Sequence, residues 1–455
     1  MHRIVTIVPA AVLAAGSFSF ASAETMTLAP GQFTQDVLDR AQDGDVFVLA
    51  AGEHKGPLRI ERRIVLQGEP GATLTGTGEG SVISVFGPDV EIRGLTISGS
   101  GHDLQAMNSG VYLEKTAERA LVENNKIVDN LFGVYIHGAT GSRVLNNEIV
   151  GLKNIRQAEA GNGVSLWNAP DVTVGGNNIS HGRDGIYTIA SRNDRFIDNR
   201  FEKVRFAIHY MYTNNSEVSG NVSIKNHVAY AIMSSNRLVI RGNVSDRDRD
   251  YGLLFNNANY SDIDGNLVVG GEIDDGPGTR EVAGDERGMM PSAGSEPDTR
   301  GARVGPGKCV FIYNANNNRF RNNWFERCEI GVHFTAGSEK NEIAGNAFIG
   351  NRNQVKYVGT RDLDWSKDGR GNYWSDNPAF DLDGDGVADT AYRPNDLVDR
   401  VLWTAPSAKI LINSPAVQVL RWAQTQFPAL YPGGVVDTHP LIAPPPRPAA
   451  ARGLP

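Results

Sequence analysis

Short runs of alternating apolar and polar residues recur along most of the chain, separated by glycine and asparagine. Typical units are "GVYIHGATGSRVLNNEI" from Gly133 and "GLLFNNANYSDIDGNLV" from Gly252. Consecutive units usually begin 22 or 23 residues apart. Short runs with a period of two indicate strands rather than helices. Strands that recur at a fixed step predict stacked repeats of one supersecondary unit.

Each unit has room for three short strands and three turns, which make one coil of a right-handed parallel β-helix. In the first strand of a unit, positions +1 and +3 after the opening residue are almost entirely apolar. Because side chains alternate across a strand, this column faces the core and positions +2 and +4 face outward. The inward column is Val111, Leu113, Val134, Ile136, Val164, Leu166, Ile186, Thr188, Ile208, Tyr210, Tyr230, Ile232, Leu253, Phe255, Val310, Ile312, Val332 and Phe334.

One asparagine recurs at the same turn of successive units. Stacked at the strand spacing of about 4.8 Å, its side-chain amides can hydrogen-bond to one another and to the turn backbone. The pattern therefore predicts an internal asparagine ladder. Its expected members are Asn125, Asn147, Asn178, Asn199, Asn221, Asn243, Asn266, Asn323 and Asn346.

The repeat predicts a β-helix over residues 24–360, with less regular coils before Ser98 and a short capping helix near its start. Three longer segments interrupt the repeat, at 98–109, 151–161 and 271–307. Each precedes the first strand of a unit, so all three are expected to leave from one corner of the coil. These insertions carry His102, Met107, Met289 and Met290.

A candidate metal site lies on the outward face of two neighbouring units. Met211 and Met233 occupy the same position of successive coils, so their Cβ atoms are expected about 5 Å apart. His209 lies two residues before Met211 on the same face. Two thioethers and one imidazole form a soft ligand set that suits Cu(I). The alternative is that the two methionines pack beneath an overhanging loop.

A second interpretation of the same face is a polysaccharide cleft, as in a secreted lyase or epimerase or a carbohydrate-binding β-helix protein. Tyr135, Tyr187 and His209 are candidates for proton abstraction beside a sugar. Hydrolysis needs paired carboxylates about 5–9 Å apart. The outward columns offer one carboxylate, Glu114. This pattern does not favour a glycosidase.

An acidic loop follows the repeat, in the segment 361–440. Asp381, Asp383, Asp385 and Asp389 occupy offsets 1, 3, 5 and 9 of a D-x-D-G-D-G pattern. Carboxylates at these offsets suit Ca²⁺, but position 12 holds Tyr392 in place of the usual glutamate. The sequence therefore predicts either a calcium site in a shortened loop or a solvated acidic turn.

The same segment ends with an apolar stretch of helical spacing after Pro415. Its face is formed by residues at steps of three or four, namely Val417, Leu420, Ala423, Gln424 and Phe427. This spacing predicts a helix with one apolar face. The helix either caps the last coil or docks on another protein. Residues 441–455, "LIAPPPRPAAARGLP", are expected to be disordered.

The chain has 455 residues and a formal net charge of −8. Nucleic acid is excluded as a partner because phosphate binding needs a basic surface. The start, "MHRIVTIVPAAVLAAGSFSFASAE", has a basic residue, an apolar run and an Ala-Ser-Ala site. It predicts a secretory signal peptide over residues 1–23 and a periplasmic protein. No later stretch is apolar enough to cross a membrane.

Cys309 and Cys328 are the two cysteines of the chain. In an oxidising compartment they favour a disulfide. Their separation of nineteen residues is close to one repeat, which allows a bridge between neighbouring coils. Two buried thiols are the alternative.

Two C-terminal blocks, read together with the coils, resemble a known family. They are "GNYWSDNPAFDLDGDGVADTAYRPNDLVDR" and "SPAVQVLRWAQTQFPALYPGGVVDTHPL". They are similar to the NosD family of periplasmic maturation proteins for nitrous oxide reductase. Coils of this kind also occur in many carbohydrate-binding proteins and sugar hydrolases, whereas the C-terminal blocks are far more specific. The resemblance covers essentially the whole chain after the signal peptide.

The resemblance implies an accessory protein that is not an enzyme. Its implied partners are the ATPase and membrane subunits of an ABC transporter, a copper-chaperone lipoprotein and nitrous oxide reductase. The protein would be peripheral to the membrane through the transporter and would support assembly of the copper-sulfide centre. The apolar C-terminal helix is, by the same resemblance, a candidate for docking on the transporter. No ligand motif is carried over, so His209, Met211 and Met233 rest on geometry alone.

Overall fold

The computed structural model describes residues 23–449, apart from residues 154, 336 and 360 and the segments 272–306, 405–410, 412–413 and 428–432. The predicted signal peptide therefore lies almost entirely outside the described residues. So do the insertion between 271 and 307 and residues 450–455. In the described part of the chain, no helix is both long and apolar enough to cross a membrane.

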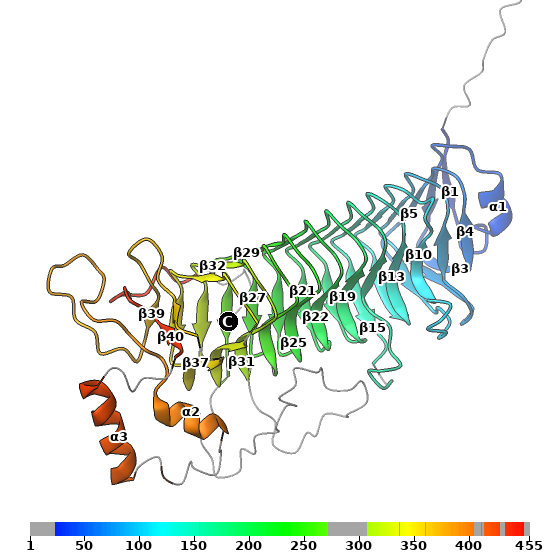
Figure 1. The fold of residues 1–455 in the computed structure, drawn as a ribbon. Helices are drawn as coiled ribbons and strands as arrows, with labels where there is room; N and C mark the ends of the chain where they lie inside the picture. Colours follow the sequence, from blue (N-terminus) through cyan, green and yellow to red (C-terminus); the bar gives the residue numbers. More distant parts are fainter. Residues whose placement is uncertain are drawn as a thin grey trace, which may run out of the picture.

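Three long parallel sheets wind around one axis and form a β-solenoid (Figure 1). The first sheet has 13 strands, from β1 (Thr25–Leu28) to β35 (Glu342–Ile343). The third also has 13 strands, from β3 (Gly52–Lys55) to β39 (Tyr373–Trp374). In each sheet a strand pairs with its equivalents in the coils before and after it. The predicted parallel β-helix is confirmed.

The second sheet is formed by the first strands of the repeat units, and it carries the candidate copper ligands. Its 12 strands are all parallel. They are β4 (Leu58–Ile60), β7 (Ile83–Val85), β10 (Ser109–Leu113), β13 (Phe132–His137), β16 (Val164–Trp167), β19 (Asp184–Ile189), β22 (Phe206–Met211), β25 (Val228–Met233), β28 (Tyr251–Asn256), β31 (Lys308–Tyr313), β34 (Ile330–Thr335) and β37 (Asn353–Val358).

The core fills the inside of the coils. All members of the predicted inward column are at most 3% exposed. Large aromatic side chains such as Tyr210, Tyr230 and Phe255 occupy successive levels of this column. Burying one large apolar side chain contributes roughly 1.5–3 kcal/mol, so a continuous column of this kind holds the coils together.

The asparagine ladder is confirmed, with one correction. At a typical step, the side-chain amide and the backbone N–H of Asn199 both donate to Oδ1 of Asn221, each over 3.0 Å. In "GGNNI" the member of the ladder is Asn177, not Asn178, which is exposed at the start of β18 (Asn178–Ser180). The ladder asparagine lies two residues before an inward residue, here Ile179. One further coil adds Asn372.

The insertions 98–109, 151–161 and 271–307 all join a strand of the third sheet to a strand of the second. The first lies between β9 (Thr96–Ser98) and β10, and the second between β15 (Glu148–Gly151) and β16. The last connects β30 (Leu267–Val269) to β31. The first two therefore leave the coil next to the outward face of the second sheet.

The two cysteines form a disulfide with a Cα–Cα distance of 5.6 Å. Cys309 lies in β31, and Cys328 follows β33 (Trp324–Glu326) of the same coil. The bridge therefore closes one coil on itself and does not join neighbouring coils. Both side chains are fully buried. The backbone N–H of Cys328 donates to Oδ1 of Asn351 in the next coil.

A short helix and a helix pair lie at opposite ends of the solenoid (Figure 1). The predicted capping helix is α1 (Gln35–Asp39), which buries Leu38. The predicted C-terminal helix is α3 (Pro415–Gln426), and it packs beside α2 (Leu397–Thr404). The Ser414 hydroxyl accepts a hydrogen bond from the Val417 N–H and caps α3.

The last described residues return to the solenoid. Leu441 is buried and bridges Tyr373 of the last coil. Arg447 forms an ion pair with Glu326 over 3.0 Å and lies over the ring of Trp324. Residues 441–449, part of the expected disordered tail, thus lie along the third sheet. These contacts were not foreseeable from a Pro- and Ala-rich stretch.

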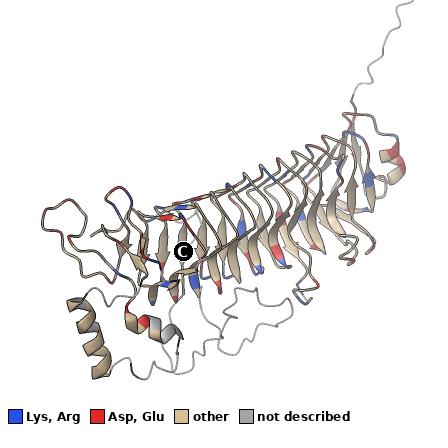
Figure 2. Cartoon of the chain, in the orientation of Figure 1, with Lys and Arg blue, Asp and Glu red and all other residues tan. Residues whose placement is uncertain are grey.

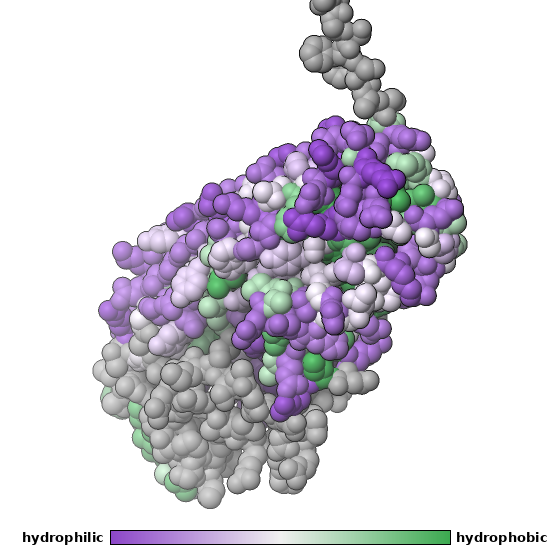
Figure 3. Space-filling view, turned by 90° about the vertical axis from the view of Figure 1, so that its right-hand side faces the viewer, coloured by the Kyte–Doolittle hydropathy of each residue, from purple (hydrophilic) through white to green (hydrophobic). Residues whose placement is uncertain are grey.

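Lys, Arg, Asp and Glu residues are spread along the coils, with both signs interspersed (Figure 2). From the end at which α1 lies, the surface is mainly hydrophilic and carries only small apolar patches (Figure 3). This distribution fits a solenoid in which most apolar residues are buried inside the coils.

Candidate copper site

Strands β22 and β25 position the predicted copper ligands. Strand pairing places Met211 directly opposite Met233, and His209 opposite Ala231. The inward residues between them, including Tyr210, fix the face on which these side chains lie, since neighbouring residues of a strand point to opposite sides. The two methionines are therefore stacked outside the core, as the repeat predicts.

This part of the outward face is largely buried, although Met211 is only partly so. Met233 is 8% exposed and His209 is 9% exposed. Met233 belongs to an apolar cluster outside the solenoid core, which Met211 and Tyr251 border. Its buried members are Phe206, Val228, Ala231, Met233, Leu254 and Phe311. Such packing fits the alternative interpretation of the methionines, and it also gives a dry, soft environment for a metal ion.

The contacts of His209 bear on both interpretations. Its Nδ1 lies 3.0 Å from Oδ2 of Asp184. Its ring packs edge-on against Phe206, at 4.8 Å between centroids, and against Tyr187 at 5.1 Å. Its Nε2 is buried and has no hydrogen-bond partner among the described residues. Buried polar atoms are almost always paired, so the unpaired Nε2 of His209 is available to a metal ion.

Asp184 and Arg205 complete a buried network around His209. Arg205 donates from Nε to Oδ1 of Asp184 over 2.8 Å and from Nη2 to Oδ2 over 2.7 Å. Burial raises the pKa of Asp184, but hydrogen bonds from His209 and Arg205 outweigh it and hold the pKa at about 2. The carboxyl group is therefore ionised.

Sequence reasoning missed both residues because it considered only positions after the opening residue of each unit. Asp184 directly precedes Gly185, and Arg205 stands two residues before Ala207. The available signal was that charged residues precede the first strands of two successive coils, in "RDGIY" with Asp184 and in "RFAIH" with Arg205.

The inserted loops contribute no ligand to this cluster within the described residues. Met107 packs with Leu131, Phe132 and Tyr135, and β13 lies three coils before the strand of Met211. His102 is exposed on the same insertion. Met289 and Met290 lie outside the described residues.

Of the residues proposed for sugar chemistry, His209 belongs to the candidate copper site and packs against Tyr187, whereas Tyr135 and Tyr187 line a cavity. This cavity of about 180 Å³ lies under the first insertion and is lined by Leu104, Met107, Tyr135, Tyr187 and their neighbours. Burial raises the pKa of Tyr135 to about 12 and also raises that of Tyr187. A tyrosine base would need the opposite shift.

The one outward carboxylate of this region, Glu114, is engaged by a histidine. Its carboxylate lies 3.3 Å from Nδ1 of His137. The hydroxyl of Tyr112 lies 3.0 Å from the same nitrogen, and the ring of Trp167 packs on His137 at 4.7 Å.

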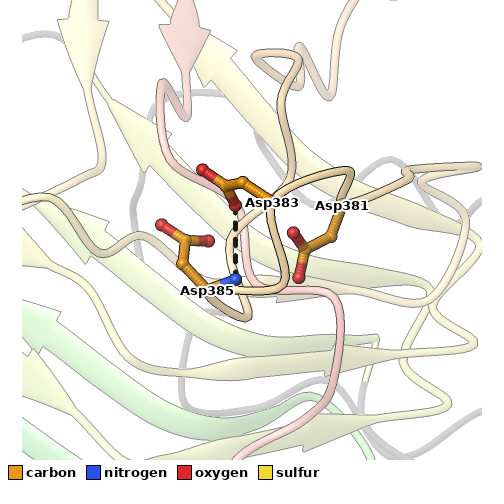
Figure 4. A group of neighbouring side chains, drawn as sticks. All are labelled: Asp381, Asp383 and Asp385. Carbon is orange, nitrogen blue, oxygen red and sulfur yellow. Dashed lines mark hydrogen bonds between the residues drawn. The ribbon is translucent and has the colours of Figure 1, made fainter.

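The acidic loop brings together three of its four predicted ligands (Figure 4). Carboxylate oxygens of Asp381, Asp383 and Asp385 lie within 4.8 Å of one another. Asp389 does not join them, because its Oδ2 accepts the Leu382 N–H over 2.7 Å. Asp381 accepts the N–H groups of Gly384 and Gly386, which shape the loop.

The charges of this loop repel one another. A hydrogen bond from the Asp385 N–H lowers the pKa of Asp383, but the carboxylates of Asp385 and Asp381 outweigh it and raise the pKa. Backbone N–H groups of Gly386 and Gly384 lower the pKa of Asp381. A bound cation would relieve this repulsion.

Comparison with known proteins assigns the family. The family model described as "Periplasmic copper-binding protein (NosD)" matches residues 145–379. A protein of Stutzerimonas stutzeri named "Probable ABC transporter binding protein NosD" is 41% identical over 394 residues, or 87% of this chain and 86% of that protein. This chain belongs to the NosD family.

A second NosD relative, from Pseudomonas aeruginosa, has the same printed name. It is 41% identical over 417 residues, which cover 91% of this chain and 92% of that protein. The family is described as periplasmic and copper-binding, and both relatives are named as binding proteins. The matched range of the NosD model includes His209, Met211 and Met233 but not α2 and α3.

Solved structures share the fold of this NosD-family chain. The surface adhesin PfbA of Streptococcus pneumoniae matches with a TM-score of 0.50 at 11% identity. The match covers 71% of this chain and 87% of the adhesin. At this identity the likeness concerns the solenoid alone.

Proposed function

We propose that this protein is a periplasmic accessory protein of an ABC transporter complex and relays copper during assembly of the copper-sulfide centre of nitrous oxide reductase. The family description and the names of its relatives support copper binding and association with a transporter. The observation that carries the copper site is the buried, unpaired Nε2 of His209 on the strand whose Met211 is stacked on Met233.

The ligand chemistry suits transfer of Cu(I). Imidazole and thioether donors are soft and neutral, and they favour a monovalent copper ion over hard cations. The surrounding apolar cluster excludes water, which would otherwise compete as a ligand. Three neutral ligands without a thiolate hold the ion loosely enough to pass it on. A copper-chaperone lipoprotein would supply the ion, and the reductase would receive it.

The helix pair is the proposed docking surface for the ATPase-driven transporter and its membrane subunit. In α3, Val419, Leu420 and Trp422 are each at least 45% exposed, and Phe427 follows the helix at 61%. Figure 2 draws this helix almost wholly without charged residues. An exposed apolar surface at one end of a long solenoid fits a protein or membrane-subunit contact.

The acidic loop is a separate part of the proposal. We propose that Asp381, Asp383 and Asp385 hold Ca²⁺, while Asp389 shapes the loop through the Leu382 N–H. Oxygen ligands of this kind suit a hard cation and not copper. The role would be structural, because the loop lies against the C-terminal residues through the Ala388 N–H and the Pro440 carbonyl.

The copper site is tested by replacing Met211 and Met233 together with leucine. Leucine preserves volume and apolarity but removes both sulfur atoms, so the variant should fold normally. We expect it to lose Cu(I) binding at least tenfold in an anaerobic competition titration and to leave the reductase deficient in copper-sulfide centre.

Met107→Leu is the matched control, since Met107 packs in a different apolar cluster. It should bind Cu(I) as the wild type does. Unchanged Cu(I) affinity in the double variant would return the two methionines to a packing role.

A further inference from the structure

His209 contacts Asp184, and Asp184 in turn is bound by Arg205, although neither residue is a proposed copper ligand. We propose that Asp184 and Arg205 are positioning residues that hold His209 with its proton on Nδ1 and its free lone pair on Nε2. This inference rests on the proposed copper function and specifies how the site is prepared for the ion.

The contacts of Asp184 determine which nitrogen of His209 carries the proton. The Asp184 side chain is 2% exposed, and both of its oxygens accept hydrogen bonds from Arg205. An ionised carboxylate is an acceptor only, so the contact at 3.0 Å requires a proton on Nδ1. In a neutral imidazole the other nitrogen then has a lone pair available to a metal.

The orientation of the ring follows from the same contact. Strand pairing places Asp184 opposite Phe206, three residues before His209 and one coil earlier. Met211 and Met233 lie in the other direction, later in the strand and in the next coil. Because the two ring nitrogens point in widely different directions, anchoring Nδ1 on Asp184 turns Nε2 away from it. Phe206 and Tyr187 pack against the ring and limit its rotation.

Arg205 has two roles in this network. Nε and Nη2 of its guanidinium each donate to one oxygen of Asp184. The guanidinium also lies 4.4 Å from the centre of the Phe206 ring. These contacts hold the carboxylate in one position. The positive charge of Arg205 also balances the negative charge of Asp184. The network therefore orients the imidazole without adding net negative charge that would retain a cation.

Metal-bound histidines commonly donate their second N–H to a carboxylate, and loss of that partner typically lowers metal affinity 10–100-fold. A purely structural ion pair between neighbouring coils is the alternative explanation of Asp184 and Arg205. In that case removal of the carboxylate would change stability but neither the His209 tautomer nor the copper affinity.

The test uses Asp184→Asn in the full-length chain. Oδ2 of Asp184 accepts from both Nη2 of Arg205 and Nδ1 of His209, so the uncharged asparagine no longer gives both donors a strong acceptor. Where Nε of Arg205 keeps the asparagine oxygen, the NH₂ group faces Nδ1. The proton of His209 should then move to Nε2. Nitrogen-15 spectra of histidine-labelled, metal-free protein report this tautomer, and a His209→Gln sample identifies the His209 signals. We expect the tautomer to switch and Cu(I) affinity to fall roughly 10–100-fold.

Asp246→Asn is the matched control. Asp246 pairs with Arg247 through similar contacts, and among the described residues no histidine is a hydrogen-bond or ion-pair partner of its side chain. It should leave the His209 tautomer and the Cu(I) affinity unchanged. Arg205→Lys keeps the charge and removes the fork, so it should keep the tautomer and reduce affinity less than Asp184→Asn does.

The outcomes distinguish failure of the proposed copper function from failure of the positioning role of Asp184 and Arg205. Wild-type protein that fails to bind Cu(I) overturns the proposed copper function. Wild-type tautomer and wild-type Cu(I) affinity in folded Asp184→Asn overturn the positioning role alone. If Asp184→Asn does not fold, full Cu(I) affinity in Arg205→Lys likewise contradicts the positioning role.

Discussion

Asn177 and Asn178 are adjacent residues of the same type with opposite surroundings. The side-chain oxygen of Asn177 accepts the backbone N–H and the amide of Asn147, and its own amide donates to Asn199 and to the Val144 carbonyl. The side chain of Asn178 is exposed. The pair therefore offers an internal comparison of a ladder residue with a surface residue.

We predict that Asn177→Ala destabilises the protein by at least about 2 kcal/mol, whereas Asn178→Ala changes stability by less than about 0.5 kcal/mol. Truncation of Asn177 leaves two donors of Asn147 without an acceptor inside the solenoid. Chemical denaturation of both variants measures the difference. Equal stabilities would mean that the ladder contributes no more than surface asparagines do.

Residue-level patterns in the sequence predicted which side chains face the core, because alternation and a 22-residue step fix both orientation and register. They did not predict that His209 and Met233 are buried on the outward side. Such burial depends on packing between neighbouring outward columns, and that packing has no period. The same limit applies to Asp184, whose role depends on Arg205 in the next coil.

At the scale of elements, the acidic loop tests whether a short motif binds its ion. The loop contacts the C-terminal residues through Val387 and Leu441, so its order affects how the chain end is held. We predict that Ca²⁺ raises thermal stability and EDTA removes the gain, by about 2.7 kcal/mol at a calcium concentration 100 times Kd. Differential scanning calorimetry measures the effect.

The loop provides its own control. Asp383→Asn removes a charge from the cluster of three and should abolish the response to Ca²⁺. Asp389→Asn retains the oxygen that accepts the Leu382 N–H and should keep most of the response. A wild-type melting temperature that is indifferent to both Ca²⁺ and EDTA would identify a plain solvated turn.

At the scale of the whole molecule, the chain end belongs to the solenoid more than its sequence indicates. β40 (Val435–Val436) pairs with β38 (Leu363–Asp364), and the third sheet continues to Trp374. Asp437 is buried and accepts hydrogen bonds from the Asn372 N–H and from Nε1 of Trp374. Contacts between segments more than 60 residues apart in the sequence leave no periodic pattern. Of this region, only the helix α3 could therefore be predicted from the sequence.

This arrangement decides how the docking surface is tested. Truncation from Ser407 onward would remove Asp437 together with α3 and expose the last coil. Leu420→Gln with Phe427→Gln instead changes only two exposed residues, at 45% and 61% exposure. We predict an unchanged melting temperature, since neither side chain is part of the core. We also predict release of the protein from the membrane fraction, since the apolar contact with the transporter would be weakened.

Tyr212→Asn with Tyr260→Asn is the control for this prediction. Both tyrosines are more than half exposed on the flank of the solenoid, and both have left-handed backbone angles, which asparagine tolerates. This variant should remain with the membrane fraction, because loss of exposed aromatic side chains away from α3 should not weaken the contact with the transporter. If the α3 variant also remains bound while folded, the docking surface lies elsewhere on the solenoid, and the exposed apolar residues of the helix pair need another partner.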